Sequence, residues 1–152
     1  MTRGNARELA VHLIYGRDFT GEEPEQVIAT RLEKEYYAQL SQENQVYSDR
    51  PSHQQMNYID TVVAGVANRV DELNAHIQKH SIDWDVSRIS RLARTIMQLA
   101  IFEILYVQDV PTNVAISEAV RIAKMYDGEE ASSFINGILG SFARSLALEA
   151  TQ

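Results

Sequence analysis

Arginine side chains at short helical spacings are the residues of this 152-residue chain best suited to binding chemistry. Arg3 and Arg7 are four residues apart, so on a helix they lie on one face. Arg88, Arg91 and Arg94 form a second group. Guanidinium groups grip phosphates and stack on bases. Groups of only two or three positive charges are usually a solvated polar face, and phosphate or RNA binding is the alternative that their chemistry allows.

Two histidines have the spacing of metal ligands. His76 and His80 are four residues apart, which on a helix places both imidazoles on one face, and the third ligand would be Asp83 or a distant residue. The sequence has no cysteine, no Gly-x-Ser-x-Gly elbow and no glycine-rich phosphate loop. We therefore expect no enzyme activity, no cofactor and no metal. A small helical enzyme or metal protein is kept as a third hypothesis, which depends on an acidic ligand meeting both histidines.

The elements that carry these side chains are predicted to be helices, organised around residues 95–106. From Ile96 to Tyr106 only Gln98 and Glu103 are polar, and a helix that is apolar on nearly every side is buried among its neighbours. The run is too short to span a membrane, which needs about 20 apolar residues. Since burying an unpaired carboxylate costs several kcal/mol, Glu103 is predicted to be a structural residue with a polar partner.

Caps and apolar spacing predict the remaining helices. Trp84 is expected to anchor a turn into the core, and Gly137 to mark a tight contact within the last helix. Residues 41–52 are expected to be a loop. Helices are expected at 2–19, 24–40, 54–79, from Asp85 or Ser87 through the central run to before Pro111, at 112–126 and at 129–148.

Composition indicates one all-α domain spanning residues 1–152. Hydrophobic residues make up 45% and charged residues 23% of the chain, as in ordinary globular proteins. The net charge of −7 argues against broad attraction to nucleic acid or anionic membrane, although it allows a local basic face. The lack of cysteine and of a visible signal peptide fits a cytoplasmic protein.

Several segments together resemble the transcription antitermination factor NusB family. In the first helix they are Ala6-Arg7-Glu8 and Leu13-Ile14-Tyr15, and 84–89 fits the family's Trp-x-x-x-Arg-Ile turn. The C-terminal half carries the more specific motifs, which are Phe102-Glu103-Ile104, 111–119, 123–126 and 134–139.

The resemblance implies a single-domain bundle of about seven helices in two packed subdomains. It also implies binding of boxA-like single-stranded RNA together with ribosomal protein S10 (NusE), within the RNA polymerase antitermination complex that reads through terminators in ribosomal RNA operons. Carried over by position, Arg3, Arg7 and Phe134 would contact RNA, and Glu130 would contact S10.

The chain departs from the family pattern at its N-terminus. Gly4 and Asn5 stand where the family often has basic residues. For a single strand, each lost phosphate contact should lower the slope of log affinity against log salt concentration by about 0.7. The alternative is therefore a protein-interaction module of the same fold, including a homodimer, with weak or lost RNA binding. That alternative gains if Arg3, Arg7 and a second basic pair do not converge.

Overall fold

The computed structural model describes residues 1–151. These residues form eight α-helices, two short 3₁₀ helices and no β-strand. The all-α fold predicted from the sequence is thus confirmed, with eight α-helices where about seven were expected. The chain divides into two compact helical units, Met1–Asn68 and Arg69–Gln152. Among residues 1–151, no helix is both long and apolar enough to cross a bilayer.

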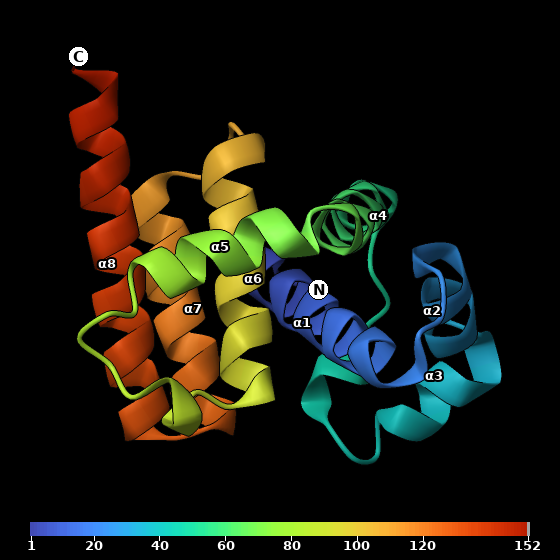
Figure 1. Cartoon of the computed structure of the whole chain (residues 1–152). Coiled ribbons are helices and arrows are strands. Elements are labelled where there is room, and N and C mark those ends of the chain that lie inside the picture. The colour runs from blue at the N-terminus through green and yellow to red at the C-terminus, as the bar shows by residue number, and fades with distance from the viewer. Residues whose placement is uncertain (152) are drawn as a thin grey trace. The chain divides into compact units, whose positions relative to one another are not determined.

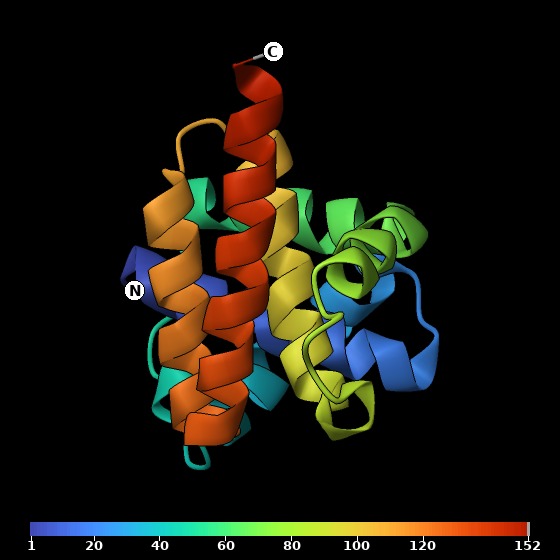
Figure 2. The ribbon, with the colours of Figure 1, turned by 60° about the vertical axis from the view of Figure 1, so that its left-hand side comes forward.

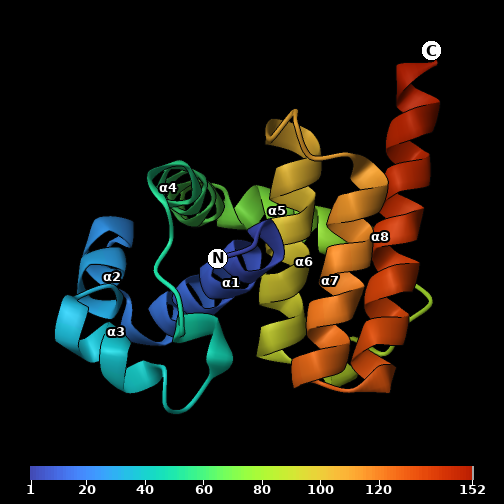
Figure 3. The same ribbon diagram turned by 180° about the vertical axis from the view of Figure 1, so that it is seen from behind.

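The first unit packs α1 against α4 and α2 (Figure 3). Helix α1 begins where the Thr2 hydroxyl accepts a hydrogen bond from the Asn5 backbone N–H at 3.0 Å, and it ends at Gly21, whose φ of 72° favours glycine. The core of this unit includes the fully buried side chains of Leu9 and Leu13 from α1 and of Ile59 from α4. The elements are α1 (Arg3–Thr20), α2 (Pro24–Arg31), α3 (Lys34–Leu40), the 3₁₀ helix η1 (Gln45–Tyr47) and α4 (His53–Asn68).

The second unit is built around α6, as the apolar run predicts. Helices α6, α7 and α8 lie side by side, joined by short loops in antiparallel order, and α5 crosses α6 and α8 (Figures 1 and 2). Helix α6 is buried at nearly every position from Ala93 to Glu103, and Glu103 itself is 0% exposed. The elements are α5 (Val70–Lys79), the 3₁₀ helix η2 (Val86–Arg88), α6 (Arg91–Tyr106), α7 (Thr112–Tyr126) and α8 (Glu129–Ala150).

Two long predicted helices are each interrupted, which corrects the prediction. The predicted helix 24–40 divides because the Glu33 carboxylate accepts hydrogen bonds from the backbone N–H groups of Glu35 and Tyr36 and caps a new helix. The predicted helix 54–79 divides at Arg69, where φ is −129° and ψ is 23°. The Arg69 guanidinium lies 4.2 Å from the centroid of the Tyr106 ring. Neither break has a glycine or proline to signal it.

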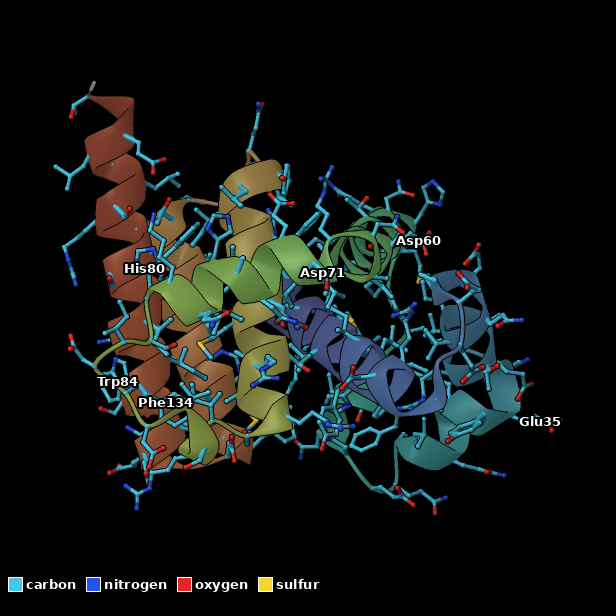
Figure 4. The ribbon with its side chains drawn as sticks, in the orientation of Figure 1. Glu35, Asp60, Asp71, His80, Trp84 and Phe134 are labelled. Atoms are coloured by element: carbon cyan, nitrogen blue, oxygen red, sulfur yellow. The ribbon has the colours of Figure 1, made fainter. Side chains whose placement is uncertain are left out.

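The tight contact predicted at Gly137 is confirmed. A Cβ atom at this position would lie 2.5 Å from Cζ2 of Trp84, closer than real contacts allow. The Trp84 ring also packs edge-on against the ring of Phe134, with centroids 6.2 Å apart (Figure 4). Trp84 therefore anchors the 81–90 turn onto α8, and the absence of a side chain at Gly137 gives it room to do so.

Candidate nucleic-acid interface

The N-terminal end of α1 is a locally positive surface. Its first turn contains no acidic residue, and Arg3 in that turn is exposed. Backbone N–H groups at a helix N-terminus carry a partial positive charge that favours anions such as phosphate. Arg3 and the start of α1 can therefore meet a phosphate without rearrangement of the helix.

Arg7, one turn further along α1, is placed differently. Its side chain is only 4% exposed, and its Cζ atom lies 5.9 Å from the centroid of the Tyr58 ring on α4. Most of the Arg7 side chain is therefore buried by packing within the first unit. A contact between Arg7 and RNA would have to use the small open fraction of the side chain, so its predicted role stays a prediction.

Phe134, the aromatic residue predicted to contact RNA, lies in the first half of α8 and is 5% exposed. Trp84, which packs against it, is 36% exposed. The sequence predicts only a packing role for Trp84, and nothing in it signals that the residue stays this exposed. Of this pair, Trp84 offers the larger flat surface to an RNA base, and the role of Phe134 stays a prediction.

Glu130, the residue predicted to contact S10, lies in the first turn of α8 and is exposed. Its Oε1 atom is 3.2 Å from Nη1 of Arg88, with the two side chains 66% and 68% exposed. Ion pairs this exposed contribute roughly 0–1 kcal/mol, so the pair can open at little cost. Glu130 is accessible to a partner, which its predicted role requires.

The cations of α7 are countered by acids. Nε of Arg121 lies 2.6 Å from the Glu118 carboxylate, and Nζ of Lys124 lies 3.9 Å from Glu129. The first turn of α1, in contrast, contains no acidic residue of its own.

The predicted site residues are divided between the two units. Arg3 and Arg7 lie on α1 in the first unit, whereas Phe134 and Glu130 lie on α8 in the second.

His76 and His80 pack against an aromatic ring. Their rings lie 5.0 and 5.9 Å from the centroid of Phe142, and Nδ1 of His80 is 2.8 Å from the Ser141 hydroxyl. Burial, followed by the charges of Lys79 and His76, lowers the pKa of His80. Within the described part of the chain no three His, Asp or Glu residues are grouped to hold a metal ion, so the metal hypothesis gains no support.

A third histidine, His12 of α1, belongs to a half-buried polar cluster in the first unit. Its Nδ1 is 2.8 Å from the Tyr47 hydroxyl, and this hydroxyl accepts a hydrogen bond from Nη1 of Arg31 at 3.3 Å. Burial, with the Arg31 charge adding to it, lowers the pKa of His12 from 6.5 to about 4. Folding therefore keeps this imidazole neutral at pH values where it would be charged in the unfolded chain.

This cluster predicts acid sensitivity. Between pH 6.5 and 4 the unfolded chain binds more protons than the folded one, so stability is full above pH 6.5 and falls as the pH drops to about 4. The loss should approach about 3 kcal/mol, at about 1.4 kcal/mol per pKa unit. Urea unfolding at several pH values should show His12→Asn removing this component. The control His53→Gln, at an exposed position, should leave it in place.

With eight α-helices in two units and no β-strand among residues 1–151, this is an all-helical protein. The chain belongs to the NusB family, whose model matches residues 4–144. A transcription antitermination protein NusB from Acetivibrio thermocellus is 38% identical over 144 residues, covering 95% of this chain and 90% of that protein.

Two solved structures have the same fold. The NusB structure from T. maritima superposes with a TM-score of 0.75 at 24% identity, covering 95% of this chain and 92% of its own. A chain from a crystal structure of antitermination factors NusB and NusE in complex with dsRNA gives a TM-score of 0.72 at 20% identity, covering 94% of this chain and 96% of its own.

Proposed function

We propose that this chain is a transcription antitermination factor that binds boxA-type RNA together with ribosomal protein S10 and promotes read-through of ribosomal RNA operons in the cytoplasm. The observation that carries this proposal is a match along nearly the whole chain to relatives named transcription antitermination protein NusB. The structure whose components are NusB, NusE and dsRNA supports RNA and a NusE-type protein as the partners.

In this proposal the residues divide between two ligands. The exposed Arg3 and the N-terminal end of α1 bind an RNA phosphate, with Arg7 behind them on the same helix. The pair of Trp84 and Phe134 presents aromatic surface to a base, mostly through the exposed Trp84. Glu130 binds a cationic side chain of S10, exchanging its weak pair with Arg88 for the partner.

Arg3→Ala tests the proposed contact between RNA and the N-terminal end of α1. We expect about fivefold weaker binding of a labelled boxA-type single strand near 0.1 M salt, since an exposed ionic contact contributes up to about 1 kcal/mol. The slope of log affinity against log salt should fall by about 0.7. Fluorescence anisotropy titrations at several salt concentrations measure both.

The matched control for this test is Arg144→Ala, which removes one exposed arginine from α8. It should change the slope less than Arg3→Ala does. Equal effects of the two variants would mean that RNA binding depends only on the total charge of the protein. The proposed contact between RNA and the N-terminal end of α1 would then be wrong.

The second candidate function is a protein-interaction module of the same fold with little RNA affinity. It is favoured by the acidic partners of Arg121 and Lys124, and by Gly4 and Asn5 in the first turn of α1. In that case Arg3→Ala would have no effect on RNA binding, because the parent protein would bind RNA too weakly to lose affinity, while S10 would still bind.

A further inference from the structure

A pocket of about 530 Å³ lies between α2 and α4 in the first unit. Its volume is within the range of roughly 300–1,000 Å³ that small-molecule sites occupy. Helix α2 and its N-cap residue contribute one wall, and α4 contributes the other. The lining residues are Glu23, Pro24, Glu25, Ile28, Ala29, Asp60, Ala64 and Asn68.

The charged groups of this pocket are all acidic. Glu23, Glu25 and Asp60 are exposed, and the lining contains no lysine, arginine or histidine. Glu23 is partly engaged, because its carboxylate completes the capping box of α2. Within residues 1–151, neither Glu25 nor Asp60 forms an ion pair. The pocket therefore carries negative charge that the lining itself does not neutralise.

The apolar part of the lining comes from Ile28, Ala29 and Ala64. An apolar surface beside carboxylates suits a long cationic side chain, whose methylene stem packs on the apolar surface while its charged head meets an oxygen. The pocket is larger than a single such side chain needs, so it can accept neighbouring side chains of one segment. A metal ion is a poor occupant, since the described residues place no three His, Asp or Glu side chains for one.

We propose that the α2–α4 pocket binds a lysine- or arginine-bearing segment of a basic protein partner. The partner is defined by charge complementarity with Glu25 and Asp60 and by the apolar lining that receives the side-chain stem. This proposal does not rest on the RNA or S10 roles proposed above, because every lining residue lies in the first unit and none of them belongs to the predicted RNA or S10 residues.

The test uses the full chain and a fluorescein-labelled heptapeptide of alternating lysine and alanine as the probe. Glu25→Gln combined with Asp60→Asn should weaken peptide binding about fivefold, because two exposed ionic contacts are lost. Ala29→Arg should weaken peptide binding more than tenfold, since the introduced guanidinium would occupy the pocket in place of the peptide. Glu35→Gln with Asp71→Asn is the matched control, which removes the same two charges from exposed sites on α3 and α5 (Figure 4).

The location of the bound peptide is measured by NMR of the ¹⁵N-labelled protein. The peptide should shift the amide signals of Ile28, Ala29 and Ala64 more than those around Glu35 and Asp71, and the control pair should leave affinity within twofold. Equal weakening by the two double variants, or shifts spread evenly over the acidic surface, would show general charge attraction and overturn the proposal. Failure of the peptide to bind the parent chain would overturn it as well.

Discussion

Replacing Glu103 with alanine is expected to lower the free energy of unfolding by about 3 kcal/mol while leaving RNA affinity of the folded protein unchanged. Glu103 is 0% exposed within α6, the central helix of the second unit. A buried carboxylate persists only with polar partners, and its removal leaves those partners unsatisfied and a void behind, at a cost of roughly 3–5 kcal/mol when the lost interaction is ionic. Chemical denaturation followed by circular dichroism measures the change.

Two further variants separate the causes of the Glu103 effect. Glu103→Gln keeps the shape and loses only the charge, so it should recover part of the stability. Glu149→Ala removes an exposed glutamate from α8 and should stay within about 0.5 kcal/mol of the parent. A Glu103→Ala protein that is as stable as the parent but has lost RNA binding would contradict the structural role.

Gly137→Ala is expected to lower the free energy of unfolding by about 2 kcal/mol, although alanine normally favours a helix over glycine. The added Cβ would lie 2.5 Å from Cζ2 and 3.2 Å from Cε2 of Trp84, so the indole ring must leave its seat on α8. Overpacking of this kind costs typically about 1–3 kcal/mol. Trp84 is the only tryptophan, so its fluorescence emission should shift to the red as the ring enters water.

The control for this substitution lies one turn along the same helix. A Cβ at Gly140 would lie 3.3 Å from Nη1 of Arg144, the flexible end of an exposed side chain that can move aside. Gly140→Ala should therefore stabilise the protein by up to about 1 kcal/mol, the ordinary helix preference for alanine. In a Trp84→Ala background Gly137→Ala should also become neutral or favourable. A destabilisation that persists in that background would show that Trp84 is not its cause.

The sequence predicts well where a pattern has one physical solution. The apolar run before Tyr106 can be satisfied only by burial, and α6 is buried there. Gly128, between α7 and α8, has a φ of 97°, a conformation that favours glycine. Helix propensity alone predicts neither the break at Glu33 nor the one at Arg69. Glu33 caps the following helix through its side chain, and the Arg69 guanidinium contacts the ring of Tyr106, which is distant in the sequence.

The candidate site was harder to predict because exposure depends on tertiary packing. Helical spacing places Arg3 and Arg7 on one face, yet the structure exposes the first and buries the second against Tyr58. Helical spacing along α8 also does not predict the burial of Phe134, because Trp84, which packs against its ring, comes from a turn outside α8. Likewise, the pairing of Glu130 with Arg88 joins residues 42 positions apart, and no local pattern reveals it.

The most direct test of the proposed function is a fluorescence titration of labelled boxA-type RNA with this protein, with and without purified S10, at two salt concentrations. The proposal predicts RNA binding that weakens as salt rises, as phosphate contacts require, and that S10 strengthens. Absence of RNA binding in the presence of bound S10 would contradict the RNA role and leave an interaction module. Failure to bind either partner would contradict the proposed function as a whole.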